Sequence, residues 1–131
     1  VGLMVWSPLA GGFLSGKYKR NMTGTSEGRR VNFDFPPIDK ERAYDIIDAL
    51  ELIAKQKNTS IAGLALAWLL HQKVVSTVII GANKMEQLDD NLKAVDITFT
   101  SDELKKLDAV SKLPSEYPGW MLERQGADRK R

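Results

Sequence analysis

The sequence contains no cysteine and a single histidine, His71. The lack of cysteine excludes disulfides and thiolate-ligated metal sites, and one histidine excludes a histidine cluster and argues against a catalytic triad. We therefore expect no metal site. Because His71 falls within an expected helix, we interpret it as a capping or packing residue.

Long apolar runs and a strong charge of one sign are also missing. No apolar run approaches the ~18 residues of a membrane-spanning helix, and no signal peptide opens the chain. Lys and Arg number 19 against 17 Asp and Glu, for a formal net charge of +2. So small a charge does not indicate nucleic acid as a partner. We expect a cytoplasmic protein with no nucleic-acid or membrane partner.

The sequence does contain alternating strand and helix patterns. An apolar run opens the chain and predicts a strand that is covered on both faces, and Asp39, Ser60 and Thr100 have the character of helix N-caps. Asn83, with Glu86 three residues later, resembles a capping box. The expected elements are a strand at 2–6, a loop at 7–38, helices at 39–57 and 60–72, a strand at 77–80, helices at 84–95 and 101–112, and an irregular tail at 113–131.

This order predicts the α/β fold class with a parallel sheet. Two strands alone leave the edges and faces of a sheet open. The chain also begins at Val1, inside a predicted strand and without a methionine. We therefore expect the sequence to be part of a larger α/β domain.

The segment from Gly11 to Lys17 has the form G-x-x-x-x-G-K. A phosphate-binding P-loop needs Ser or Thr after the lysine, where this chain has Tyr18, and a helix that begins there. Neither is present, so we reject the interpretation of this segment as the P-loop of a nucleoside triphosphatase. Two interpretations remain open. The glycines, Gly16 among them, form a strand-to-loop turn with positive φ, or the segment approaches another phosphate-bearing ligand, with Trp6 as a stacking platform.

Two motifs together resemble the C-terminal half of the aldo-keto reductase family. They are WSPLAGGFLSGKY at 6–18 and VIIGANKMEQLDDNLKAV at 78–95, and the similarity extends from Val1 to about Trp120. Bacterial members and potassium-channel β subunits are the most similar branch. Family members are (β/α)8 barrels that transfer hydride between NADPH and a carbonyl. The resemblance therefore implies that residues 2–6 are the seventh strand and residues 77–80 the eighth, with both motifs at the carboxyl ends of barrel strands.

The resemblance also implies cofactor-binding residues. Trp6 would stack on the nicotinamide ring, and the segment after it would follow the pyrophosphate with small residues and free backbone N–H groups. Lys17 would contact a phosphate, and Arg29 or Arg30 could close the long loop over the cofactor. A third group would hold the adenosine-phosphate end. The complete set is Trp6, Ser7, Pro8, Leu9, Gly11, Lys17, Arg29, Arg30, Gly81, Ala82, Asn83, Gln87, Asp90 and Asn91.

The chain departs from the family in two respects. Gly81 and Gln87 stand where many members have a lysine and an arginine for the 2′-phosphate, yet the channel-β-like branch lacks these residues too and is still regarded as NADPH-binding. We therefore expect NADPH rather than NADH, with Lys17, Lys84 and the Arg29/Arg30 pair as candidate charge partners. The family's catalytic Asp, Tyr, Lys and His lie on earlier strands, so we expect no catalytic residue in this chain.

The hypothesis is a C-terminal, NADPH-binding half of an aldo-keto reductase, inactive alone, whose parent enzyme acts on a small aldehyde or ketone. The alternative is a non-catalytic nucleotide-binding accessory module similar to channel β subunits. If the chain exists as this piece, its open strand edges predict self-association. Tyr117 and Trp120 in the tail either line a substrate pocket or close the side of the barrel.

Overall fold

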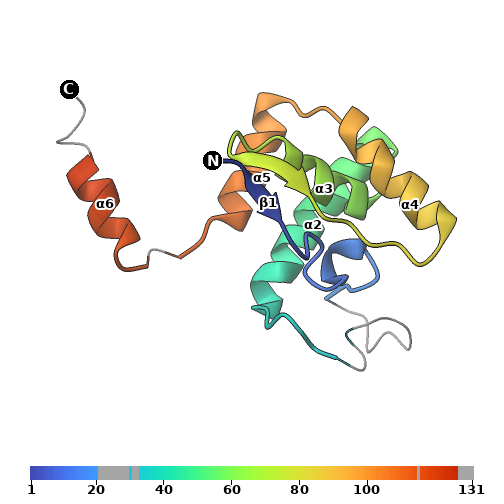
Figure 1. Cartoon of the computed structure of the whole chain (residues 1–131), viewed down its shortest axis with the longest axis horizontal. Coiled ribbons are helices and arrows are strands. Elements are labelled where there is room, and N and C mark those ends of the chain that lie inside the picture. The colour runs from blue at the N-terminus through green and yellow to red at the C-terminus, as the bar shows by residue number, and fades with distance from the viewer. Residues whose placement is uncertain (21–29, 31–32, 115, 127–131) are drawn as a thin grey trace.

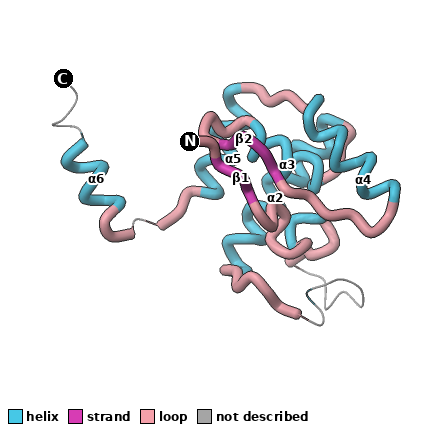
Figure 2. Tube along the Cα trace, in the orientation of Figure 1, coloured by secondary structure: helices cyan, strands magenta, loops and turns pink. Residues whose placement is uncertain are grey.

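The computed structural model describes residues 1–20, 30, 33–114 and 116–126. Two short strands, β1 (Leu3–Val5) and β2 (Val75–Val78), lie side by side and are parallel, as the alternation of elements predicts (Figures 1 and 2). Leu3 pairs with Val75 and Val5 with Val78. The Ile79 N–H donates to the Val5 carbonyl at 2.9 Å, which extends the pairing by one residue.

Two helices connect the strands. Helix α2 (Lys40–Lys57) is capped by Asp39, and α3 (Ile61–Leu70) by Ser60, and both caps are as predicted. The Ser60 hydroxyl accepts from the Gly63 N–H at 2.8 Å. In each case the side-chain oxygen satisfies an N–H that has no partner within the helix.

The remaining described elements are short. They are η1 (Phe13–Ser15), α4 (Met85–Leu92), η2 (Lys93–Asp96), α5 (Ser101–Ser111) and α6 (Gly119–Gly126). Helix α5 begins at the predicted N-cap Thr100 with a capping box, in which the side chains of Thr100 and Glu103 each accept from the other's backbone N–H. No described helix has the length and apolar character needed to cross a membrane.

The core lies between the helices. Helix α2 packs on α3 and α5, and buried Leu50, Leu64 and Leu107 belong to one cluster. A second cluster around Leu66 and Ala94 receives Val78 of β2. Helices α2, α3, α4 and α5 therefore pack together, and β2 packs on α3 (Figure 1).

Three sequence predictions about these elements are wrong. The first strand is not covered on both faces, because Leu3 is 51% and Met4 is 61% exposed. Asn83 does not cap α4: Lys84 holds that position, and the Gln87 side chain instead accepts from the Asn83 N–H at 3.1 Å. The tail is not irregular throughout, because its Met, Leu, Glu, Arg and Gln residues favour α6, which stands apart from the other elements in Figure 1.

The predicted role of His71 is confirmed. It is the C-cap residue of α3, and its backbone N–H donates to the Ala67 carbonyl. Its Nδ1 lies 2.8 Å from the same carbonyl oxygen, and its ring meets Phe99 edge-on at 5.0 Å between centroids. The histidine is therefore an exposed residue that caps the helix end and contacts Phe99.

Candidate functional site

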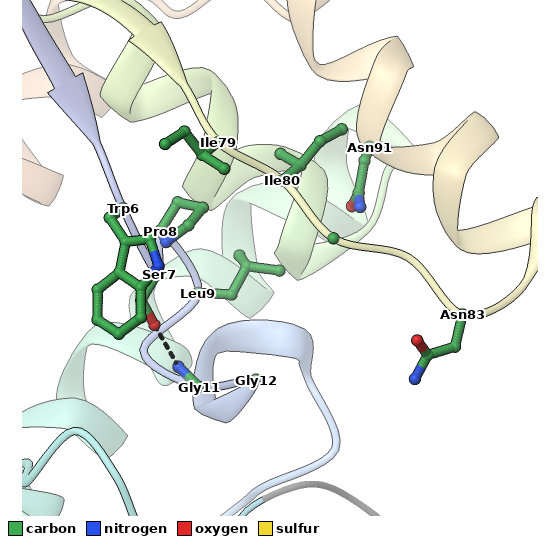
Figure 3. A pocket seen from close by; sticks show the side chains of 11 residues that line it. Trp6, Ser7, Pro8, Leu9, Gly11, Gly12, Ile79, Ile80, Asn83 and Asn91 are labelled. Carbon is green, nitrogen blue, oxygen red and sulfur yellow. Dashed lines mark hydrogen bonds between the residues drawn. The ribbon is translucent and has the colours of Figure 1, made fainter.

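The candidate site begins where β1 and β2 end. Because the strands are parallel, their carboxyl ends meet at one edge of the sheet, and Trp6 and Ile79 follow there directly. A pocket of about 420 Å³ opens at this edge (Figure 3). It is lined by Trp6, Ser7, Pro8, Leu9, Gly11, Gly12, Ile79, Ile80, Gly81, Asn83 and Asn91.

Trp6 presents its indole ring to this pocket. The side chain is 61% exposed, and its ring centroid lies 6.3 Å from that of Phe35 at an interplanar angle of 52°. A tilted aromatic neighbour at this distance supports the ring without stacking on it. A flat ligand could therefore stack on the indole.

The turn after Trp6 is held by its own hydrogen bonds. The Ser7 hydroxyl accepts from the Gly11 N–H at 3.1 Å (Figure 3), and the Ala10 N–H donates to the Ser7 carbonyl at 2.9 Å. The Gly12 N–H donates to the Leu9 carbonyl. The Gly11 N–H, which the resemblance implied to be free for a phosphate, is therefore used by the turn itself, as are the N–H groups of Ala10 and Gly12.

Left-handed backbone explains the glycines of this turn. Gly11, Gly12 and Gly16 have φ values of 65°, 90° and 83°, which confirms the positive φ predicted for all three. A Cβ built on Gly11 would lie 2.6 Å from the Phe35 carbonyl oxygen. The turn thus depends on Gly11 for both its conformation and its space.

A second pocket of about 260 Å³ adjoins the first. The two share Leu9, Gly11, Gly12, Gly81 and Asn91, so they form one continuous surface. The full lining of the second pocket is Leu9, Gly11, Gly12, Ser15, Lys17, Tyr18, Ser60, Ala62, Gly81, Gln87, Asp90 and Asn91.

Lys17 supplies the positive charge of the second pocket. Among the described residues, no carboxylate pairs with its ammonium group. The carboxylate of the same pocket, Asp90, accepts from the Ser60 hydroxyl at 2.5 Å and is held by the start of α3. The pocket therefore offers a cation to a ligand, opposite a fixed acceptor of hydrogen bonds.

Two hydroxyls beside Lys17 have unused hydrogen-bonding capacity. Ser15 Oγ and Tyr18 Oη are buried and have no partner within the described part of the chain. Buried hydroxyls are ordinarily satisfied by protein, water or ligand. Both residues line the second pocket together with Lys17.

The structure brings together the predicted site residues with three exceptions. Arg30 is only 8% exposed, donates to the carbonyls of Ala10 (2.9 Å) and Pro36 (2.7 Å) and pairs with Asp34, so it braces the glycine turn. Ala82 is exposed and lines neither pocket. Arg29 lies outside the described residues.

Sequence reasoning missed several lining residues. Ile79 and Ile80 were expected only as part of the strand at 77–80, whereas β2 ends at Val78 and both residues line the first pocket. Ser60 and Tyr18 had signals of their own, since one caps a helix and the other follows the glycine-lysine pair. The remainder are Gly12, Ser15 and Ala62. Tyr117 and Trp120 of the tail line neither pocket.

These features define an α/β protein with a candidate site at the carboxyl edge of parallel strands. Residues 1–112 match the model of the aldo/keto reductase family, and the chain belongs to that family. The family consists of oxidoreductases that fold as (β/α)8 barrels and use NADPH or NADH. The two parallel strands with their helices agree with this architecture.

Curated relatives support the assignment. The chain is 35% identical over 113 residues to an L-glyceraldehyde 3-phosphate reductase of Escherichia coli O157:H7, with 82% of this chain and 33% of the relative covered. It is 37% identical over 118 residues to a putative voltage-gated potassium channel subunit beta of Schizosaccharomyces pombe, with 83% and 33% covered. A probable subunit of the same kind from Oryza sativa is 36% identical over 116 residues, with 84% and 35% covered. The chain therefore spans about a third of the length of these relatives.

Proposed function

We propose that the chain is the C-terminal, nucleotide-binding part of an NADPH-dependent aldo-keto reductase. The observation that carries the proposal is the pair of adjoining pockets at the carboxyl ends of β1 and β2, with Trp6 on one and Lys17 on the other. Their shared wall is the glycine turn together with Gly81 and Asn91. A dinucleotide has the matching order of flat ring, diphosphate and phosphorylated ribose.

Each part of the surface has a distinct task in this proposal. When bound, the nicotinamide ring supplies the hydride that reduces a carbonyl carbon. Trp6 orients that ring and shields one of its faces from water. The glycine turn lets the backbone approach the diphosphate closely, and the side chains of Gln87, Asp90 and Asn91 hold the adenosine end.

The preference for NADPH over NADH rests on charge. The 2′-phosphate adds negative charge at the adenosine end, where the second pocket carries Lys17 without a carboxylate partner among the described residues. Lys84 stands at the start of α4, close in sequence to Gln87. Arg30 is a weaker candidate than the sequence implies, because its guanidinium already binds Ala10, Pro36 and Asp34.

Titration of the chain with NADPH tests the proposal through tryptophan fluorescence. We expect saturable quenching, and we expect Trp6→Ala to weaken binding by about 2- to 10-fold, the range for the loss of one aromatic contact. Trp120→Phe is the matched control, because Trp120 lines neither pocket. A folded chain that shows no saturable response to NADPH would contradict the proposal.

The same protein is expected to show no carbonyl-dependent oxidation of NADPH. The family's catalytic tyrosine, lysine and aspartate belong to earlier strands, and His71 is bound to Ala67 and Phe99. Turnover that survives repurification would show that the catalytic groups are within this chain after all.

A second candidate function is a nucleotide-binding accessory subunit that performs no reduction. It is favoured by the relatives that are named as putative or probable potassium channel subunits beta. Both functions require the same pockets, so NADPH binding does not separate them. Carbonyl-dependent oxidation by the longest natural protein that contains this chain separates them, since only the reductase would turn over.

A further inference from the structure

The wall of the second pocket continues into a pair of cations. Lys17 and Tyr18 line the pocket, and the next two residues are Lys19 and Arg20. Neither Lys19 nor Arg20 lines either pocket of the candidate site. Their side chains bind helix α2, so the chain passes directly from the ligand-facing wall to an anchoring point.

Arg20 binds α2 through several groups at once. Its Nη1 donates to Glu41, its Nη2 lies 2.5 Å from Asp45 Oδ1, and its Nε lies 3.9 Å from Asp48 Oδ2. Its guanidinium also lies 5.6 Å from the centroid of the Tyr44 ring. The hydrogen bond to Glu41, with the charges of the three acids, raises the pKa of Arg20 above its ordinary value.

Mutual repulsion among the acidic residues of α2 favours the binding of these cations. Glu41, Asp45 and Asp48 are spaced by four and three residues, so they lie on one face of the helix and repel one another. Arg20 neutralises this face, and Lys19 Nζ reaches Glu51 Oε1 at 2.7 Å one turn further on. Detaching Arg20 would leave Glu41, Asp45 and Asp48 without this cation, whereas Glu51 would keep Lys55 at 3.4 Å.

An aromatic stack couples the same wall to α2. The Tyr18 ring stacks on Phe13 with centroids 4.8 Å apart and an interplanar angle of 13°. Phe13 is buried and meets Tyr44 of α2 at 5.4 Å. The residues on both sides of the Lys17–Tyr18 wall are thus tied to one helix, by ion pairs on one side and by rings on the other.

We propose that Lys19 and Arg20 are positioning residues for the nucleotide site. Their ion pairs with α2, here called the clasp, hold Lys17 where it meets the phosphate of the ligand. This inference rests on the proposed function and adds residues that touch no part of the cofactor. The clasp fixes the backbone on the C-terminal side of Lys17, so that the long lysine side chain is presented from a defined position. Ordering the wall before the ligand arrives lowers the entropy lost on binding.

Affinity for NADPH in a mutant cycle tests the clasp. We expect Arg20→Ala to weaken binding by about 1.5- to 5-fold, the equivalent of one exposed ion-pair contribution. Because Arg20 acts through Lys17, Arg20→Ala should cost little further affinity in a Lys17→Gln background. The double substitution Glu41→Gln/Asp45→Asn, which leaves Arg20 in place, should reproduce the loss.

Lys105→Ala is the matched control, because Lys105 pairs with Asp102 on the exposed face of α5 and lies outside both pockets. Its affinity should equal that of the wild type. If the wild type binds NADPH and Arg20→Ala binds equally well, the clasp is overturned while the proposed function stands. An equal loss of NADPH affinity for Arg20→Ala in the wild-type and in the Lys17→Gln background would also overturn it. If the folded wild type binds no NADPH, the proposed function fails and the clasp fails with it.

Discussion

At the scale of single residues, Gly11 is constrained more tightly than its neighbours in the turn. Its φ of 65° is unfavourable for other residues, and an added Cβ would lie 2.6 Å from the Phe35 carbonyl oxygen and 3.1 Å from Arg30 Nη1. Gly12 has a positive φ but open space around it. The turn therefore tolerates a side chain least at Gly11, which lines both pockets.

We expect Gly11→Ala to lower the free energy of unfolding by roughly 1–3 kcal/mol, since it adds backbone strain and a contact with rigid backbone. Gly81→Ala is the matched control: Gly81 also lines both pockets, but a Cβ there meets no atom within 4 Å. Denaturant unfolding of the two variants measures the difference. Equal stability of both would contradict the account of the turn.

At the scale of elements, the helix ends are determined locally. The Thr100 hydroxyl accepts from the Glu103 N–H at 3.3 Å, and the Glu103 carboxylate accepts from the Thr100 N–H at 2.7 Å. Lys57 of α2 pairs with the same carboxylate at 3.1 Å. This capping box therefore also joins α5 to the end of α2.

Charge at Glu103 should make stability depend on pH. Partial burial alone would raise the pKa of Glu103, but the Thr100 N–H and then Lys57 outweigh it and lower the pKa below its ordinary value. A carboxyl with a lowered pKa in the folded state stabilises fully above its unfolded pKa and loses that contribution as pH falls through the folded value. The contribution should therefore be present at neutral pH and disappear in acid.

Glu103→Gln tests this, because glutamine keeps the capping hydrogen bond and removes only the charge. We expect a lower melting temperature than the wild type at pH 7 and a difference that shrinks below about pH 4. Asp102→Asn, at a highly exposed neighbour, should change the melting temperature much less. A constant difference for Glu103→Gln across the whole pH range would show that its charge contributes nothing.

At the scale of the whole molecule, the sheet is the open part of the structure. Leu3 and Met4 of β1 are more than half exposed, while α3 packs against β2 on the helix side. Exposed apolar side chains beside unpaired strand edges favour contact with another sheet.

We therefore expect the chain to self-associate as its concentration rises, as measured by sedimentation velocity. Met4→Lys should weaken the association, because it places a charge on the open strand. Leu113→Lys, at an exposed apolar residue outside the sheet, is the control. A monomer at every concentration would contradict this expectation.

The sequence predicted the helices well because their signals are local. The caps at Asp39, Ser60 and Thr100 lie within a few residues of the N–H groups that they satisfy. The prediction failed at Asn83, because α4 begins one residue later, with Lys84 at the N-cap position, and the Asn83 N–H instead donates to the Gln87 side chain. It also failed for the tail, where helix-forming residues outweighed Pro118 before the helix and Gly119 at its first position.

The site was predicted in part. Family motifs placed Trp6, Lys17 and Asn91 on one surface, and the structure brings them to adjoining pockets. The role of Arg30 was not predictable, because its partners Ala10 and Pro36 meet it only after the turn has folded back.

By itself, the sequence determined where helices begin, which glycines take left-handed backbone, and which family the motifs resemble. These properties depend on neighbouring residues, on sterics at single positions and on local patterns. Only the tertiary structure decided the pairing of β1 with β2, the partners of Arg20 on α2, and the use of the turn's own N–H groups. The strand pairing and the partners of Arg20 join groups that are distant in sequence, and packing brings them together. The N–H groups of the turn could have bonded either a ligand or the turn itself, and only the folded turn shows their partners.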